Sequence, residues 1–193
     1  MADAARRRAT YQDVLKAPAH MVAEVVDGEL HLQPRPALIH AAAASALGEE
    51  LGPPFKRGKG GPGGWILLDE PELHLGADIV VPDMGGWLKT RLSAVPDDAY
   101  LILRPDWVAE VLSPRTERFD RITKLAVYAR EQVPWVWLVN PRERMLEILN
   151  LGVDGRWILV GTYSGEELIR AQPFDAIEFD LAALWADAAP LAK

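Results

Sequence analysis

Two carboxylates and a lysine are the residues of this chain whose types and spacing could do chemistry. Asp83 ends an apolar run, residues 78–83, that is typical of a β-strand, and Glu110 lies inside a second such run, residues 106–112. A buried charge without a partner is costly, or its pKa shifts until the group is neutral. A divalent metal ion is one partner that would satisfy both acids, and Lys124 could place a cation beside them.

Each of these residues also has a structural explanation, and taken singly that explanation is favoured. Asp83 would end its strand in a turn, and Glu110 would pair with an arginine. Asp120 and Lys124 would form a solvent-exposed ion pair one helical turn apart. The same helical spacing sets Tyr128 on the side of Asp120 and Lys124. Whether the residues form a site therefore depends on the elements that position them.

The first half of the chain predicts a short helix, a hairpin, a longer helix and several strands. Asp27-Gly28 favours the positive φ angles of a type I′ turn, so it predicts a hairpin. The glycine- and proline-rich residues 52–64 predict a loop, which we expect to be the most mobile segment. The expected helices are 11–15, capped by Thr10, and 37–51. The expected strands are 22–26, 29–33, 65–68, 72–75 and 78–83, with Met84-Gly85-Gly86 ending the last and a helical or irregular connection over 87–100.

The second half predicts a strand, a helix and a strand in succession, which is typical of a parallel crossover. The strands are 106–112 and 135–139, and the helix spans 116–131. We expect the buried face of that helix to carry Ile122, Leu125, Ala126 and Ala129. A hairpin over 145–149 and 157–160 and a helix over 181–186, capped by Asp180, complete the chain.

The length and composition predict one globular domain, residues 1–193. Apolar residues make up 49% of the chain and charged residues 25%, as in ordinary folded proteins. No apolar run approaches the length needed to span a bilayer, and no apolar segment follows the arginines near the start. We therefore expect no membrane partner and a cytoplasmic location.

Residue types exclude several kinds of site. The chain has no cysteine, which excludes disulfides, thiolate nucleophiles and cysteine zinc sites. The four histidines, His20, His31, His40 and His74, show no paired metal spacing. Any metal would be held by oxygen, which favours magnesium or manganese.

Charge argues against broad, non-specific binding of nucleic acid, because the net charge is −7. Local basic segments remain at residues 6–8, 56–59 and 115–121, although each alone is better explained as solvated surface. Gly58 to Gly63 spells a GxGxxG pattern, but it precedes a strand rather than a helix, so it does not predict nucleotide binding.

The residues together resemble the Uma-type family of putative restriction endonucleases, formerly a domain of unknown function, within the PD-(D/E)XK nuclease superfamily. The resemblance runs from Tyr11 to about Val160 and is most specific over residues 105–114. It also includes residues 24–30, His40, Val81-Pro82-Asp83, Asp120 with Lys124, Tyr128, Val133-Pro134 and residues 137–139. It implies an α/β (α+β) restriction-endonuclease-like core: a central mixed β-sheet flanked by helices, with an N-terminal hairpin.

The resemblance also implies roles for particular residues. Asp83 would be the aspartate of the PD element, and Glu110 the acid of the next strand. The family pattern places a lysine two residues after Glu110, but Leu112 stands there. Similar proteins use a lysine displaced onto the following helix, which here is Lys124.

The implied site is catalytic through Asp83, Glu110, Lys124 and Glu24. Asp83, Glu110 and Glu70 are the expected ligands of Mg²⁺ or Mn²⁺, with Glu70 the least securely aligned. In this hypothesis Lys124 orients the attacking water or stabilises the phosphate, and Glu24 accepts a hydrogen bond from Lys124 or a metal-bound water.

The implied function is a metal-dependent endonuclease that hydrolyses phosphodiester bonds in DNA, and a homodimer would let two sites cut both strands. The alternative is a catalytically inactive nuclease-fold protein acting as a binding or assembly module. The acidic balance and the lack of a DNA-reading module favour that alternative. So do the seven tryptophans, with Trp135 and Trp137 expected on opposite faces of one strand. A small-molecule hydrolase or binding barrel is a weaker third hypothesis, because no nucleophile elbow is present.

Overall fold

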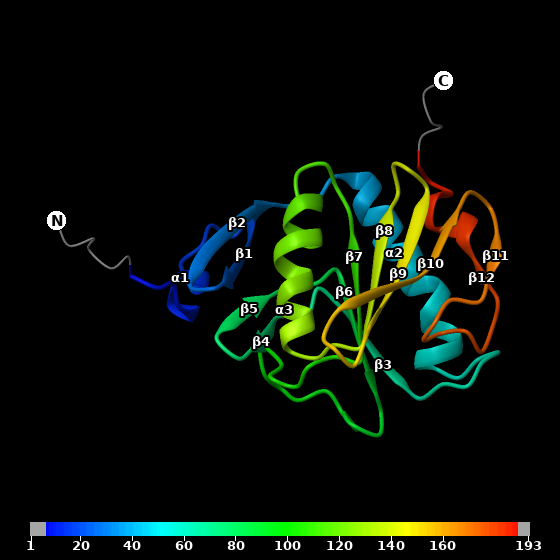
Figure 1. The fold of residues 1–193 in the computed structure, drawn as a ribbon, viewed down its shortest axis with the longest axis horizontal. Coiled ribbons are helices and arrows are strands. Elements are labelled where there is room, and N and C mark those ends of the chain that lie inside the picture. Colours follow the sequence, from blue (N-terminus) through cyan, green and yellow to red (C-terminus); the bar gives the residue numbers. More distant parts are fainter. Residues whose placement is uncertain (1–6, 189–193) are drawn as a thin grey trace.

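The computed structural model describes residues 7–188, which form two main sheets with helices against them (Figure 1). The larger sheet has six strands in the order β10-β9-β8-β7-β6-β3. Its strands β7 and β8 are parallel and the other neighbours are antiparallel, so the sheet is mixed. The smaller sheet has four strands in the order β2-β1-β5-β4. The predicted central mixed sheet flanked by helices, with an N-terminal hairpin, is confirmed.

The elements have the following bounds. The helices are α1 (Tyr11–Leu15), α2 (Leu38–Leu51), the π-helical segments η1 (Gly52–Lys56) and η2 (Phe119–Lys124), α3 (Leu125–Arg130) and the 3-10 helix η3 (Leu181–Trp185). The strands of the first half are β1 (Met21–Val26), β2 (Glu29–Pro34), β3 (Trp65–Asp69), β4 (Leu73–Leu75), β5 (Asp78–Val80) and β6 (Met84–Leu88). Those of the second half are β7 (Trp107–Val111), β8 (Trp135–Asn140), β9 (Met145–Leu151), β10 (Trp157–Ser164), β11 (Leu168–Ile169) and β12 (Phe179–Asp180).

Helices cover both faces of the six-stranded sheet. On one face, side chains of α2 and of the C-terminal segment pack against Trp107, Ala109 and Trp137. On the other face, Val127 and Tyr128 of α3 pack against the alternate residues of the same strands. Neighbouring side chains in a strand point to opposite faces, and here both faces are covered. The strands β7 and β8 are therefore apolar almost throughout. Within residues 7–188, no helix is long and apolar enough to cross a membrane.

Local turn chemistry fixes the hairpin turn and the starts of α1 and η3 as predicted. Asp27 and Gly28 have φ angles of 53° and 81°, which is the type I′ geometry. At the start of α1, the Thr10 backbone N–H donates to the Asp13 carboxylate at 2.8 Å. The Asp180 carboxylate accepts from the Ala182 backbone N–H at 3.0 Å at the start of η3. The structure thus confirms both predicted caps.

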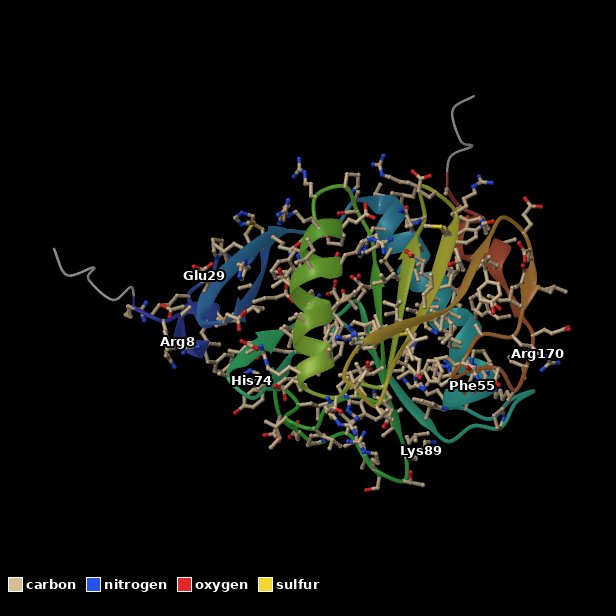
Figure 2. All side chains as sticks on the ribbon, viewed as in Figure 1. Arg8, Glu29, Phe55, His74, Lys89 and Arg170 are labelled. Atoms are coloured by element: carbon tan, nitrogen blue, oxygen red, sulfur yellow. The ribbon has the colours of Figure 1, made fainter. Side chains whose placement is uncertain are left out.

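Two predictions about the middle of the chain are wrong. Residues 84–88 do not end a strand: they form β6, which pairs with both β3 and β7. Residues 52–56 are not loop, because α2 continues into η1, which buries Phe55 at the end of the helix (Figure 2). In both places glycine and proline suggested a break, but tertiary packing of apolar neighbours decided the local structure.

Two predictions about faces are also wrong. Ile122 is exposed, whereas the helix buries Asp120, Lys124, Val127 and Tyr128. The helix therefore turns a partly polar face inward. Trp135 and Trp137 lie on the same face, since residues two apart in a strand point the same way, and both pack in one core cluster.

Glycine is needed in β6 because tryptophan rings pack directly on its backbone. A Cβ added at Gly85 would lie 2.8 Å from Cη2 of Trp87 and 3.0 Å from Cγ of Pro71. We expect Gly85→Ala to lower the free energy of unfolding by about 1–3 kcal/mol, as other overpacked cores do. Urea unfolding measures the change, with Gly52→Ala as a comparison, because Gly52 has a φ of −61° and an added Cβ there meets no atom within 4 Å. A wild-type midpoint for Gly85→Ala would show that the rings yield freely.

Candidate functional site

The predicted site residues line one cavity of about 470 Å³ between elements of both sheets. Glu24 comes from β1, Glu110 from β7 and Lys124 from the end of η2, while Asp83 comes from the connection between β5 and β6. That connection carries the chain from the smaller sheet to the larger one. The cavity therefore lies where the two sheets, α2 and the continuous helix formed by η2 and α3 meet.

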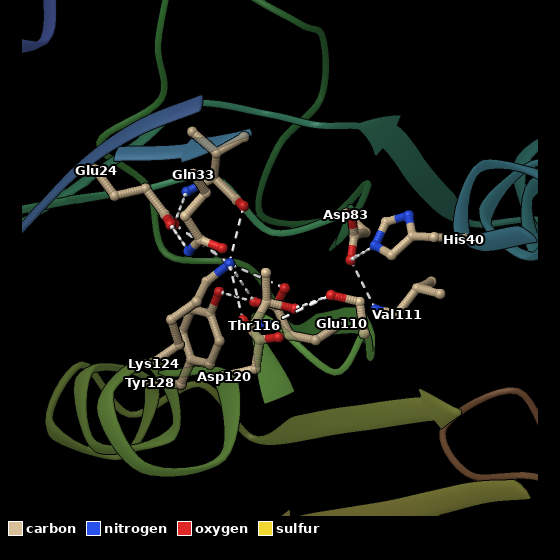
Figure 3. Close-up of polar contacts among 12 residues, drawn as sticks. Glu24, Gln33, His40, Asp83, Glu110, Val111, Thr116, Asp120, Lys124 and Tyr128 are labelled. Carbon is tan, nitrogen blue, oxygen red and sulfur yellow. Dashed lines mark hydrogen bonds and ion pairs between the residues drawn. The ribbon is translucent and has the colours of Figure 1, made fainter. Parts of the chain in front are cut away.

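Lys124 lies at the centre of a buried polar cluster (Figure 3). Its Nζ donates to Oε2 of Glu110 and to the carbonyl oxygen of Val81, both at 2.9 Å. Oε1 of Glu24 lies 3.3 Å from Nζ, and Oδ1 of Asp120 lies 4.0 Å from it. Only 3% of the side chain is exposed, so these contacts replace water around the ammonium.

Glu110 and Glu24 hold Lys124 from opposite sheets. Oε1 of Glu110 also accepts from the hydroxyl of Tyr128 at 2.5 Å. Glu24 is fixed by the Val81 backbone N–H, which donates to Oε1 at 2.8 Å, and by Gln33, which donates to Oε2 at 3.1 Å. Both carboxylates are thus hydrogen-bonded in place.

The cluster places one cation among three buried acids. Burial alone would lower the pKa of Lys124, but Glu110 and Glu24 outweigh it and raise that pKa well above its usual value. Burial raises the pKa of Glu110 well above its usual value, although Lys124 opposes the shift. Burial and the charge of Glu110 likewise raise the pKa of Tyr128, which stays a donor. A single ammonium does not neutralise Glu24, Glu110 and Asp120 together when all three are ionised.

Asp83 lies beside this cluster and is bound through other groups. Met84 pairs with Ala109, so the next step along the antiparallel register brings Asp83 level with Glu110. Oδ2 of Asp83 accepts from the Val111 backbone N–H at 2.7 Å and lies 3.2 Å from Nε2 of His40. Figure 3 shows Asp83 and His40 together, apart from the contacts of Lys124.

Glu70 is brought to the same cavity but not into the cluster. It is exposed, and its backbone N–H donates to the carbonyl oxygen of Asp83 at 3.0 Å. The backbone of Glu70 has a φ of 44° and so adopts the left-handed conformation. The structure therefore places Glu70 next to Asp83 through the backbone, with its side chain on the cavity wall.

Several residues of this site were not predicted from the sequence. His40 entered only as part of the family resemblance, and Gln33 and the Val81 carbonyl were not expected at all. His40 is buried, and its Nδ1 has no hydrogen-bond partner among the described residues. A backbone carbonyl leaves no signal in the residue types, whereas a histidine next to a helix start could have been weighed. The helix itself changes from π-helical to α-helical turns at Lys124, a feature often found at functional sites.

Asp120 makes stability depend on pH. Burial raises its pKa from 3.8 to about 6, against the opposing effect of Lys124. A raised carboxyl pKa means that the folded state binds the proton of Asp120 more tightly than the unfolded chain does. The bound proton therefore stabilises the fold at low pH, and this stabilisation is lost as pH rises from about 4 to about 6. Without metal, we expect Asp120→Asn to remove that loss and to be more stable than the wild type at pH 7 by up to ~3 kcal/mol.

Urea unfolding at pH 4, 5, 6 and 7 with EDTA measures this effect. Asp154→Asn, in an exposed turn, is the matched control and should follow the wild type at every pH. A constant difference between Asp120→Asn and the wild type across this range would contradict the raised pKa.

The donor set fits a hard divalent cation bound by two carboxylates. Among residues 7–188, no three groups of the types His, Cys, Asp and Glu are placed together to hold a metal ion. Mg²⁺, however, is commonly held by one or two carboxylates, with water and phosphate oxygens completing its shell. Both contacts of Asp83 use Oδ2, and Oε2 of Glu110 accepts from Lys124 alone. Since a carboxylate has about four acceptor positions, both acids keep free capacity.

Comparisons with known proteins agree with this architecture. The family model Uma2, described as "Putative restriction endonuclease", matches residues 9–183. A solved structure from Anabaena variabilis ATCC 29413, titled a putative nuclease belonging to DUF820, matches with a TM-score of 0.69. The two sequences are 17% identical, and the match covers 92% of this chain and 98% of the other, so it shows a shared fold. No curated protein sequence matches the chain significantly.

Proposed function

The chain belongs to the Uma2 family, described as "Putative restriction endonuclease", and from this we propose that it is a metal-dependent endonuclease that hydrolyses phosphodiester bonds in DNA. One observation carries the proposal: Asp83, Glu110 and Lys124, from three separate elements, line a single cavity. The restriction-endonuclease-like superfamily generally uses divalent metal ions, and the oxygen donors here suit Mg²⁺ or Mn²⁺.

In this proposal, Asp83 and Glu110 would hold the ion, and Glu70, which lines the same cavity, is a further candidate ligand. When bound, the ion would polarise the phosphate and favour ionisation of a water molecule. The Val111 backbone N–H keeps Asp83 oriented, and Tyr128 keeps Glu110 oriented. Both acids are thereby held before substrate arrives, which is how a site limits reorganisation during the reaction.

Lys124 acts in the proposal as the cation beside the reacting phosphate. Its Nζ donates to Val81 and Glu110, and Oε1 of Glu24 forms an ion pair with it. The contact with Glu24, 3.3 Å, is the longest of these and is the one that a substrate oxygen or the attacking water would replace. Glu24 is then a positioning residue, which keeps the ammonium at the cavity wall.

A non-catalytic binding or assembly module is the second candidate. The observation that favours it is that protein oxygens of Val81, Glu110 and Glu24 surround the buried ammonium of Lys124. In that case the cluster around Lys124 would serve only to join the two sheets to the helix formed by η2 and α3.

Incubation with supercoiled plasmid distinguishes the two candidates. We expect wild-type protein to nick the plasmid with Mg²⁺ or Mn²⁺ and to leave it intact with EDTA. An intact plasmid with both ions, over a range of pH and protein concentration, would overturn the proposed activity in favour of the binding module. Because one site cuts one strand, we also propose a homodimer, which sedimentation analysis would detect.

A further inference from the structure

A second cavity adjoins the proposed active site. It has a volume of about 680 Å³ and lies along α2, η1 and the end of β3. The two cavities share part of their lining, including His40, Glu70 and Asp83. They therefore meet at Asp83, and the proposed site lies in the middle of a longer depression rather than at its end.

Cations line this depression on both sides of Asp83. Arg35, Arg115 and Arg142 line the first cavity, and Lys56 and Arg57 line the second. All five side chains belong to exposed residues, although the net charge of the chain is −7. Acids gather between these two groups, at Glu110, Asp120 and Asp83, where the metal ion is proposed.

Among the described residues, these cations lack the acidic partner that three arginines elsewhere in the fold have. Arg91, Arg121 and Arg130 each form an ion pair with an acid. The five cations of the depression are Arg35, Lys56, Arg57, Arg115 and Arg142. In the described part of the chain, no carboxylate lies within ion-pair distance of any of them. Lys56 donates instead to the carbonyl oxygen of Leu67 at 2.8 Å. Cations without an acidic partner are available to a ligand that brings its own negative charge, and exposed arginine binds phosphate well.

We propose that one DNA strand lies across both cavities, with the phosphate to be cut at Asp83. The flanking phosphates on one side bind Arg35, Arg115 and Arg142, and those on the other side bind Lys56 and Arg57. This inference rests on the proposed nuclease function and adds the path of the substrate. Since the strand continues past the site in both directions, cleavage occurs within a strand and needs no free end.

The two sides differ in expected strength. Glu49 and Asp69 also line the second cavity and oppose a phosphate there. The first cavity has three arginines against the acids of the site itself. The first cavity should therefore contribute more to DNA affinity than the second.

Single charge reversals test the path by binding rather than by activity. The probe is a fluorescein-labelled single-stranded 16-nucleotide DNA, followed by anisotropy in EDTA, where cleavage does not occur. The variants are Arg115→Glu in the first cavity and Arg57→Glu in the second. Arg156→Glu is the matched control, because its side chain is 86% exposed and lines neither cavity.

Relative to Arg156→Glu, we expect Arg115→Glu to weaken DNA binding by roughly tenfold or more. We expect Arg57→Glu to weaken it by a few-fold. Each should also reduce the slope of log affinity against log salt by about 0.7, the value for one lost phosphate contact on a single strand. Equal urea midpoints would show that all three variants are folded. No measurable binding by the wild type, or an effect of either cavity variant no larger than that of Arg156→Glu, would overturn the path.

Cleavage of circular single-stranded DNA separates this inference from the proposed activity. Loss of affinity in both cavity variants, with neither cleavage of this DNA nor nicking of plasmid by the wild type, would uphold the strand path and reject the nuclease. Cleavage by the wild type that neither variant impairs would uphold the nuclease and reject the path.

Discussion

Lys124→Ala is expected to lower the free energy of unfolding by about 3–5 kcal/mol at pH 8, as removal of one partner from a buried ion pair generally does. The ammonium is the only cation in contact with Glu110 and Glu24 in the described structure, and both carboxylates are almost fully buried. Without it, each acid must either stay charged in a low-dielectric surrounding or take up a proton. Urea unfolding, extrapolated to water, measures the loss.

The size of this loss should depend on pH in a defined direction. Removal of Lys124 raises the pKa of Glu110 and Asp120 further, so the folded variant binds more protons than its unfolded chain. The variant is then least destabilised at low pH and loses stability as pH rises. Lys124→Met, which keeps most of the alkyl chain, should lose nearly as much stability as Lys124→Ala at pH 8. Lys89→Ala, an exposed control, should stay within about 0.5 kcal/mol of the wild type.

A Lys124→Met variant as stable as the wild type at pH 8 would contradict this account of the cluster. It would mean that the acids are already protonated in the folded protein and that the lysine contributes packing alone. The proposed cation beside the phosphate would then have no support from the electrostatics of the site.

Asp83→Asn is expected to reduce Mg²⁺-dependent plasmid nicking by at least about 100-fold while leaving the fold intact. The amide keeps an oxygen that can accept from the Val111 backbone N–H, but it loses the charge that would hold the ion. Losses of 10²–10³ are common when a group that stabilises transition-state charge is removed. The side chain is 19% exposed, so the substitution should change stability much less than a change at Lys124.

Initial nicking rates at saturating Mg²⁺ measure this effect, with equal urea midpoints as the test of folding. Asp154→Asn removes the same charge in an exposed turn and should nick at the wild-type rate. Nicking by Asp83→Asn at the wild-type rate would remove Asp83 from the proposed site.

The fold could be predicted from the sequence wherever local chemistry and packing favoured the same structure. Asp27-Gly28 set the hairpin turn, and the apolar runs around Val108 and Val136 identified two buried parallel strands. The prediction failed at Gly85-Gly86, where glycine usually breaks a strand. There the small residues leave room for tryptophan rings, which is a property of the packed sheet and not of the segment.

The site was predictable in its residue types but not in its geometry. The spacing of Asp120, Lys124 and Tyr128 predicted their common side, and the structure adds that this side is buried. Apolar residues such as Ile122 suggested the opposite face, because periodicity alone cannot recognise a buried polar cluster. The contact of Lys124 with the Val81 carbonyl could not be predicted either, since it joins positions 43 residues apart through a backbone atom.

The structure also bears on the unusual position of the lysine. Leu112 stands where a lysine would follow Glu110 on the same strand, and it is buried in the core. Lys124 reaches Glu110 from the next helix instead, at 2.8 Å from Oε1. The ammonium thus meets the carboxylate from a helix and not from the same strand.

The central claim is that Asp83 and Glu110 hold a divalent ion, and calorimetric titration with Mn²⁺ tests it most directly. We expect the wild type to bind Mn²⁺ at one site per chain, and Asp83→Asn and Glu110→Gln to bind at least about tenfold more weakly. Wild-type affinity in both variants, or no binding to the wild type, would contradict the claim.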